Sequence, residues 1–238
     1  MPTEYFDINK FHKGWGLIVF PISMTRIANA QNAEAHIEYL RKFIPKIVEP
    51  KIGVHFLYTE GLYMNMPGSA YEMKNSYLNS MVAHANAFKK LLKKNQREMQ
   101  IHEAFSFDSW FQMHLSHPDV LGSQREIKKF YETNDMFRSL VAEDAAQNKK
   151  ILDEHQLSFF LEEHTFAYLL LNGQIKLRND FVKGREEWIL LAYPGMPPKA
   201  QIYLVQNDPL SIGKYPNPYK GQYDLVSRKF IDYSKPFE

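Results

Sequence analysis

Two short apolar segments separated by a helical pattern constrain this chain more than any other feature. The first runs from Gly16 to Ser23 and the second from Ile52 to Tyr58. Continuous apolar strands, rather than alternating ones, are typical of parallel sheets that helices cover on both faces. Between them, residues 30–44 carry apolar side chains at helical spacing as far as Pro45. The order strand, helix, strand predicts a βαβ unit and therefore an α/β fold.

The remaining pattern predicts more of the same architecture. A long helix is predicted over 69–97, and the segment 123–171, which has no Gly or Pro, predicts two or three helices. Further strands are predicted at 99–107, 188–193 and 202–205. We expect a three-layer parallel sheet with a helical lobe, in a single domain over 1–238. The segment from about residue 214 is a C-terminal extension rich in Tyr, Pro and Lys. Its composition predicts an extended arm.

Composition excludes several classes of protein. There is no Cys among the 238 residues, which excludes disulfides, thiolate metal sites and a cysteine nucleophile. The apolar runs are far shorter than the roughly 20 residues that cross a bilayer. Glu4 and Asp7 precede the first run and Pro21 interrupts it, so we expect no signal peptide and a cytoplasmic location. The net charge of +2 leaves room for a local basic patch.

Sequence motifs for the commonest enzyme classes are missing. There is no G-x-G-x-x-G, no G-x-x-x-x-G-K-[ST], no G-x-S-x-G and no H-x-x-x-H. The glycine loops that cradle nucleotide phosphates, the serine-hydrolase elbow and paired metal ligands are therefore unsupported. An ordinary dehydrogenase, kinase or hydrolase is disfavoured, and no metal is expected.

The serine that follows the first strand is the first candidate site residue. Ser23 stands at the carboxyl end of that strand, where substrates of parallel sheets bind. Its hydroxyl can act as a nucleophile if a base activates it. Alternatively, Ser23 or Thr25 only caps the next helix, and spacing alone favours this simpler role.

Five basic residues form a second candidate. They are spaced to share one face of the predicted long helix, and no acidic residue lies among them. They are Lys89, Lys90, Lys93, Lys94 and Arg97. Such a basic stripe can contact nucleic-acid phosphates. The alternative is a solvated, lysine-rich helix face.

Two tyrosines and an amide form the third candidate. Tyr168 and Asn172 are four residues apart on a predicted helix and share a face, and Tyr193 ends a predicted strand. Together they can bind an amino group or another polar substrate atom. Most tyrosines in such places are packing residues whose hydroxyl reaches solvent.

Taken in order, these features resemble the cyclodipeptide synthases, which make cyclic dipeptides from two aminoacyl-tRNAs. The residues that carry the resemblance are Leu17 to Arg26, the basic stripe, Tyr131 to Arg138, the Tyr168 segment, and Leu190 to Pro194. They span most of the chain, and each motif is short. Tyr193-Pro194, with Arg26 three residues after the serine, resembles the subfamily that has Tyr-Pro in the later motif.

The resemblance implies a fold, an activity and residue roles. The fold would be Rossmann-like, similar to the catalytic domain of class I aminoacyl-tRNA synthetases. Ser23 would be the nucleophile, a tyrosine and a carboxylate one turn apart would hold the aminoacyl group, and a later tyrosine would complete the site. The matching positions for these catalytic roles are Ser23, Tyr168, Asn172 and Tyr193. Substrate contacts are expected from Val19, Pro21, Arg26 and Leu191, which favours an apolar amino acid.

Two positions depart from the family pattern. The family usually has glutamate where Asn172 stands, and a small residue where Pro21 stands. Asn supplies neither charge nor a general base at neutral pH. Either Glu162 or Glu163 fills the role from an earlier helical turn, or proton transfer follows another route.

The predicted partners are aminoacyl-tRNAs, held through their phosphates without reading of sequence. An aminoacyl ester is already activated, so the resemblance implies no cofactor and no ATP. We expect a monomer with no membrane or DNA partner. Two other functions stay open: a non-catalytic α/β module that binds RNA or a small ligand, and an α/β esterase or acyltransferase of small esters.

Overall fold

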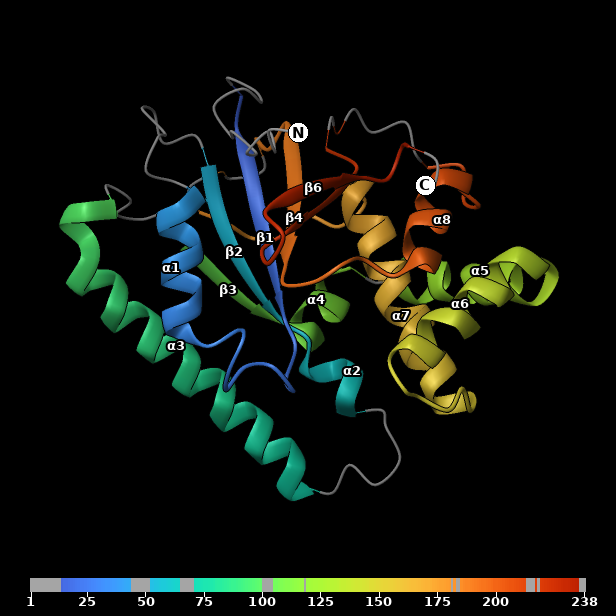
Figure 1. The fold of residues 1–238 in the computed structure, drawn as a ribbon, viewed down its shortest axis with the longest axis horizontal. Helices are drawn as coiled ribbons and strands as arrows, with labels where there is room; N and C mark the ends of the chain where they lie inside the picture. Colours follow the sequence, from blue (N-terminus) through green and yellow to red (C-terminus); the bar gives the residue numbers. More distant parts are fainter. Residues whose placement is uncertain are drawn as a thin grey trace.

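A mainly parallel sheet organises the molecule. The computed structural model describes residues 14–43, 52–64, 71–99, 105–117, 119–180, 182, 185–212, 217 and 219–235. Within them, six strands pair in the order β3-β2-β1-β4-β5-β6 (Figure 1). The strands are β1 (Gly16–Ile22), β2 (Ile52–Tyr58), β3 (Phe105–Ser109), β4 (Trp188–Tyr193), β5 (Gly221–Asp224) and β6 (Lys229–Asp232). All neighbours are parallel except β5 and β6. The predicted α/β fold is confirmed.

Helices cover both faces of this sheet (Figure 1). They are α1 (Ala33–Phe43), α2 (Glu60–Met64), α3 (Tyr71–Met99), α4 (Trp110–Ser116), α5 (Asp119–Thr133), α6 (Asp135–Gln147), α7 (Glu154–Leu171) and α8 (Lys199–Asn207). One face carries α1 and α3, and the other carries α7 with α2 and α4. Helices α5, α6 and α8 pack beyond α7 as the predicted helical lobe.

Alternation along β1 divides the core into two layers. Leu17 and Val19 point to the α7 side, whereas Ile18 and Phe20 point to the α1 and α3 side, and all four are fully buried. The strand is therefore apolar on both faces, which explains its uninterrupted apolar run. At its start Gly16 allows close packing, because a Cβ there would lie 1.9 Å from the Trp188 ring.

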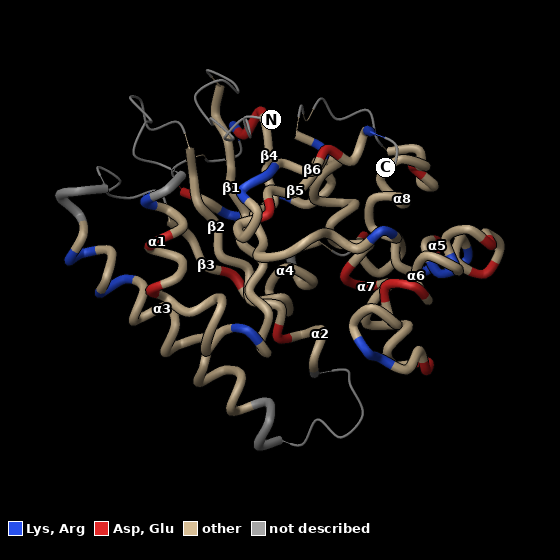
Figure 2. Tube along the Cα trace, in the orientation of Figure 1, with Lys and Arg blue, Asp and Glu red and all other residues tan. Residues whose placement is uncertain are grey.

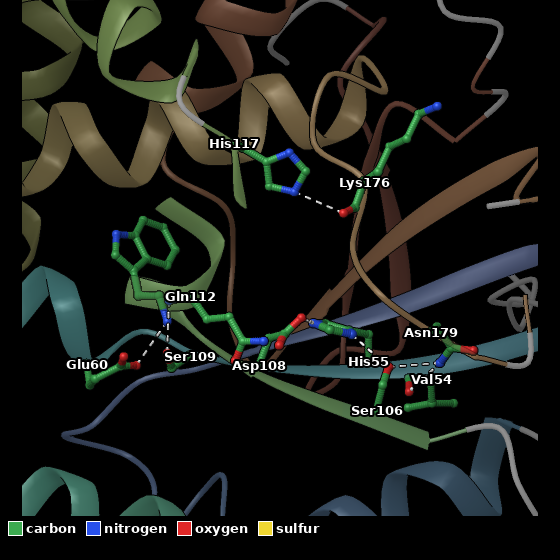
Figure 3. Close-up of polar contacts among 11 residues, drawn as sticks. Val54, His55, Glu60, Ser106, Asp108, Ser109, Gln112, His117, Lys176 and Asn179 are labelled. Carbon is green, nitrogen blue, oxygen red and sulfur yellow. Dashed lines mark hydrogen bonds and ion pairs between the residues drawn. The ribbon is translucent and has the colours of Figure 1, made fainter. Parts of the chain in front are cut away.

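Polar contacts fix the edge strand β3 to the rest of the sheet (Figure 3). The His55 Nδ1 atom lies 2.7 Å from Ser106 Oγ, and Asn179 donates to the same oxygen at 2.9 Å. Asn179 thereby ties the segment after α7 to β2 and β3. At the other end of the strand, the Glu60 carboxylate accepts the backbone N–H of Trp110 at 3.2 Å. These bonds hold the start of α4 beside α2.

Two predicted strands differ from the observed structure. Residues 202–205 belong to helix α8, where Ala200, Gln201, Leu204 and Val205 are buried at helical spacing. A four-residue apolar and polar pattern fits either element, and neighbouring residues decide the outcome. The strand predicted over 99–107 begins only at Phe105, because α3 continues to Met99; residues 100–104 lie outside the described ranges.

The described part of the C-terminal extension is not an extended arm. It forms β5 and β6, and β5 adds to the sheet beside β4. The Tyr233 side chain is fully buried, and its hydroxyl accepts a hydrogen bond from Gln201 at 2.6 Å. These two strands thus belong to the same sheet as β4. Across the residues that are described, no helix has the length and apolarity to cross a membrane.

Candidate active site

The sheet creates a crevice at the carboxyl ends of β1 and β4. The chain moves from β1 to β2 on one side, while β4 and β5 extend the sheet on the other. Such a reversal of strand order is where parallel sheets bind ligands. A cavity of about 260 Å³ lies there, between the sheet and α7. Its polar wall includes Ser23, Arg26, Tyr63, Glu163 and Tyr193.

A tight turn presents Ser23 to this cavity. The Ser23 N–H donates to the Gln31 side chain at 2.9 Å, and Gln31 donates back to the Pro21 carbonyl at 2.7 Å. These bonds fix the chain after β1. The Ser23 hydroxyl lies 2.6 Å from the Tyr63 hydroxyl and 2.9 Å from the Thr25 hydroxyl. Ser23 is 7 % exposed, so the oxygen faces the cavity rather than bulk water.

Glu163 supplies a carboxyl group from α7. Burial raises the pKa of Glu163 to about 7, with the charge of Asp144 raising it further and that of Arg26 opposing the shift. A carboxyl group with this pKa exchanges its proton near neutral pH, as a general acid or base requires. Of the two carboxylates considered as substitutes for Asn172, Glu163 lines the cavity, whereas Glu162 accepts a hydrogen bond from Trp110.

Tyr193 and Arg26 close the side of the site next to β4. The Arg26 guanidinium donates to the Pro194 carbonyl at 2.6 Å and lies 5.2 Å from the centre of the Tyr193 ring. This cation–π contact holds the two side chains together. Burial, and then the charge of Glu163, raise the pKa of Tyr193, while Arg26 and the Ser23 hydroxyl lower it. Tyr193 is therefore a neutral hydrogen-bond donor at pH 7.

The structure brings Ser23 and Tyr193 to one cavity and leaves Tyr168 and Asn172 outside it. The Tyr168 hydroxyl donates a hydrogen bond to the Asp208 carboxylate. Asn172 caps the end of α7, and its side-chain amide donates to the Tyr168 carbonyl at 3.0 Å. The two do share a helix face. That face, however, points away from the face that carries Glu163. At about 100° per residue, Tyr168 lies about 140° and Asn172 about 180° around the helix axis from Glu163. Neither side chain lines the cavity.

The predicted substrate contacts divide in a similar way. Pro21, Arg26 and Leu191 line the cavity. Val19 points to the same side of the sheet as Pro21 but lies two residues deeper in β1, where it is fully buried in the core. No sequence motif pointed to the aromatic part of the wall, which comes from Trp110, Phe159, Phe160 and Phe166.

The basic stripe lies on α3, which packs on the other side of the sheet from α7 (Figure 2). Lys89, Lys90, Lys93 and Lys94 are exposed, while Phe88 faces the core. Arg97 belongs to the same helix, and its side chain is outside the described set. The Lys89 ammonium sits 5.2 Å from the Phe107 ring centre, which brings the stripe close to the edge strand β3.

The residues that are described include no cluster of three or more His, Asp and Glu side chains suited to a metal ion.

Comparison with known proteins relates the fold to one group of solved structures. No family model and no curated protein matches this chain. The structure is similar to a cyclodipeptide synthase from Bacillus thermoamylovorans, with a TM-score of 0.52 and 17 % identity over 91 % of this chain and 90 % of the other. It is also similar to a CDPS from Staphylococcus haemolyticus, with a TM-score of 0.53 and 14 % identity over 81 % and 83 %. At these identities the likeness is one of fold.

Proposed function

We propose that this protein is a tRNA-dependent cyclodipeptide synthase of the subfamily with Tyr-Pro in the later motif. The observation that carries the proposal is the meeting of Ser23, Glu163 and Tyr193 in one cavity at the reversal of strand order. A hydroxyl nucleophile, a carboxyl group that titrates near pH 7 and a neutral phenol are the groups that aminoacyl transfer requires. The fold of the two similar structures supports the same reaction.

The first half-reaction transfers an aminoacyl group to Ser23. Its Oγ forms a bond to the ester carbonyl carbon of the first aminoacyl-tRNA, and the bond from that carbon to the ribose oxygen breaks. The serine proton ends on the ribose oxygen that leaves. Ionised Glu163 pairs with the ammonium group of the substrate, and Tyr193 donates a hydrogen bond to the aminoacyl group. Because the ester is already activated, the step consumes no ATP.

The second half-reaction builds the dipeptide. The amine of a second aminoacyl-tRNA attacks the acyl carbon, the bond to Ser23 Oγ breaks, and a dipeptidyl-tRNA results. Its free amine then attacks the remaining ester, which closes the ring and releases the second tRNA. Glu163 is the group in the cavity that can accept the amine proton, given a pKa of about 7.

The cavity wall indicates the kind of amino acid that enters. The wall includes the aromatic side chains of Trp110, Phe160 and Phe166 as well as the side chain of Leu191. Apolar walls with a few placed polar groups favour an apolar side chain. We expect the first substrate to carry a large apolar amino acid.

The tRNA itself meets the basic stripe on α3. Its exposed lysines match phosphate oxygens and would bind without reading the bases. The stripe reaches β3 at one edge of the sheet, so a bound tRNA would pass around that edge to bring its 3′ end to the cavity. A monomer in the cytoplasm, where aminoacyl-tRNAs are made, fits this proposal.

Product analysis tests the activity. Purified protein is incubated with a mixture of aminoacyl-tRNAs, and diketopiperazines are sought by mass spectrometry. We expect a cyclic dipeptide from the wild type and none from Ser23→Ala. Ser158→Ala is the matched control, because Ser158 is exposed on α7. Absence of any product from the wild type would refute the proposal, and hydrolysis of simple esters without use of tRNA would favour an esterase.

A further inference from the structure

Ser23 is hydrogen-bonded to a residue that sequence analysis did not single out. The Tyr63 hydroxyl lies 2.6 Å from Ser23 Oγ, nearer than the Thr25 hydroxyl at 2.9 Å. Tyr63 belongs to α2, the short helix that follows β2, so it comes from a different element than Ser23 and Glu163. Both of these hydrogen bonds of the serine oxygen run to hydroxyl groups.

Tyr63 also supplies a hydroxyl group next to α7, at a place where α7 itself has none. The resemblance implies a tyrosine and a carboxylate one helical turn apart, and the residue one turn before Glu163 is Phe159, which has no hydroxyl. Both Phe159 and Glu163 line the cavity. The Tyr63 ring packs against Phe159, with ring centres 5.3 Å apart. The phenol of Tyr63, a residue of α2, thus lies beside this turn of α7.

The environment keeps Tyr63 a proton donor. Burial raises the pKa of Tyr63, and the charge of Glu163 adds to the rise, while the hydroxyls of Ser23 and Thr25 lower it. The phenol therefore keeps its proton near neutral pH and can donate it in a hydrogen bond to Ser23 Oγ. A donor that is already aimed at an oxygen stabilises that oxygen most when negative charge develops on it.

We propose that Tyr63 is a catalytic residue whose hydroxyl stabilises Ser23 Oγ as the leaving group when the aminoacyl-enzyme is broken down. The inference rests on the proposed function for the identity of the acyl group. In this step a bond forms from the attacking nitrogen to the acyl carbon, and the bond from that carbon to Oγ breaks. The electron pair goes to Oγ. The proton that nitrogen loses ends on Oγ by way of Glu163, and Tyr63 keeps its own proton throughout.

The proposal predicts that loss of the Tyr63 hydroxyl slows one half-reaction more than the other. During acylation Oγ is the nucleophile and gains no net charge, whereas during transfer to the amine it leaves as an oxyanion. The loss of one donor to a developing oxyanion typically costs 10²- to 10³-fold. In Tyr63→Phe we expect breakdown of the acyl-enzyme to fall by about 100-fold, with acylation changed by less than about tenfold.

An aryl ester separates this test from that of the proposed function. The p-nitrophenyl ester of phenylalanine acylates a serine without tRNA, so the burst of nitrophenolate reports acylation. The steady state reports breakdown of the acyl-enzyme by water, a step in which Ser23 Oγ is again the leaving group. Rates are divided by the burst amplitude, which counts only folded sites. Tyr77→Phe is the matched control, because Tyr77 contacts the Tyr63 ring at 5.8 Å and lies on α3. The same variants are then given aminoacyl-tRNA, and the acyl-enzyme is followed by intact mass.

The outcomes separate the two proposals. A Tyr63→Phe enzyme with a normal burst, a slow steady state and accumulated acyl-enzyme supports the role of Tyr63, provided that Tyr77→Phe behaves as wild type. The role of Tyr63 is overturned if Tyr63→Phe breaks down its acyl-enzyme as fast as wild type. It is also overturned if Tyr63→Phe and Tyr77→Phe lose the same fraction of that rate. If wild type reacts with the aryl ester but not with aminoacyl-tRNA, the synthase proposal fails while the split between the two rates still decides on Tyr63. No burst at Ser23 with either substrate overturns both.

Discussion

At the scale of single residues, Glu163 governs how the site responds to pH. Burial brings the pKa of Glu163 to about 7, against 4.5 for an ordinary glutamate, so the carboxyl group gains its negative charge between about pH 6 and 8. Only the ionised form can pair with an ammonium group or accept a proton. The charge of Arg26 favours ionisation and limits the rise.

Under the proposed function, we predict that the rate of cyclodipeptide formation rises with pH through a midpoint near 7. Glu163→Gln should lose this rise and lower the rate by about 10² to 10⁴, the usual range for a general base. The rate is measured from pH 5.5 to 8.5 with saturating substrate. Glu162→Gln, whose carboxylate bonds to Trp110 and His114, should keep the wild-type profile. An unchanged midpoint in Glu163→Gln would assign the rise to the substrate amine.

The neighbouring residue, His164, affects stability rather than chemistry. It is fully buried, and neither ring nitrogen has a hydrogen-bond partner among the described residues. Burial lowers the pKa of His164 to about 3, so the folded protein holds it neutral while the unfolded chain takes up a proton below pH 6.5. Titration of His164 therefore leaves stability unchanged well above pH 6.5 and lowers it as pH falls through that value, because the unfolded state then binds more protons.

Replacement of His164 by leucine should stabilise the protein. The change removes two unsatisfied buried nitrogens, which typically cost about 1–3 kcal/mol each when lost from water, and keeps an apolar side chain of similar size. We expect a higher melting temperature at pH 7.5 and a larger advantage at pH 5.5. Thermal melts at both pH values measure it, with His155→Leu, an exposed position on the same helix, as control. A lower melting temperature in His164→Leu at both pH values would show that the imidazole has a partner in solution.

The place of a residue could be predicted where one strand position decided the geometry, and Ser23 and Tyr193 do line one cavity. Ser23 and Tyr193 follow or end buried strands, and the carboxyl ends of neighbouring parallel strands meet. On α7 the motif spacing pointed to Tyr168 and Asn172, which reproduce the spacing of a tyrosine and a carboxylate one turn apart but do not line the cavity. Which face of that helix meets the sheet depends on packing that a single motif does not contain. Glu163 was open as an alternative for the same reason, and no local pattern pointed to Tyr63.

At the scale of elements, α3 carries the basic stripe. Its four lysines are exposed, and the helix is held to the sheet by Phe88, whose ring centre lies 4.6 Å from that of Phe56. The stripe can therefore be neutralised without disturbing the core.

Replacement of Lys89, Lys90, Lys93, Lys94 and Arg97 by alanine should weaken tRNA binding and flatten its salt dependence. Each lost phosphate contact reduces the slope of log K against log salt by about 0.7 to 0.9, so five contacts account for about 4. Binding is measured by fluorescence anisotropy between 50 and 300 mM salt. The control is Lys128→Ala with Lys129→Ala, two exposed residues on α5. Equal slopes for stripe variant and wild type would assign the stripe to solubility alone.

Elements with an uninterrupted apolar run or a long helical pattern could be predicted. A four-residue pattern was too short to identify its element. Strands β2 and β4 begin and end at the predicted residues, because each is a compact apolar run between polar or Pro-containing segments. The segment 123–171 divides into parts of three helices, α5, α6 and α7, as its length required. The four residues 202–205 were predicted as a strand because so short a window cannot distinguish a period of 2 from one of 3.6.

At the scale of the whole molecule, the C-terminal strands complete both the sheet and the site. Gln222 on β5 lines the cavity, and its side chain donates to the Gly195 carbonyl at 2.8 Å. The Asp224 carboxylate accepts the Gly195 N–H at 2.8 Å. The loop after Tyr193 is thus held by β5 and not by β4 alone.

A chain that ends at Ile212 should lose its cooperative thermal transition. The truncation exposes β4 as a new edge and removes the buried Tyr233 side chain, whose burial and hydrogen bond contribute to the core. Circular dichroism melts and limited proteolysis measure the loss. Tyr233→Phe, which removes only the hydroxyl, should cost about 1 kcal/mol and keep the transition. A cooperative melt of the truncated chain would restore the view of this segment as a dispensable arm.

The pairing of β1 with β4 also sets the order in which activity can appear during synthesis. Val19 pairs with Leu191, so the strand that precedes Ser23 finds its neighbour only when most of the chain has left the ribosome. Domains form as units during translation, and such distant pairs close late. A growing chain lies among the aminoacyl-tRNAs that this protein would consume. Under the proposed function, Ser23 therefore stays inert toward them until β4 has emerged and paired with β1.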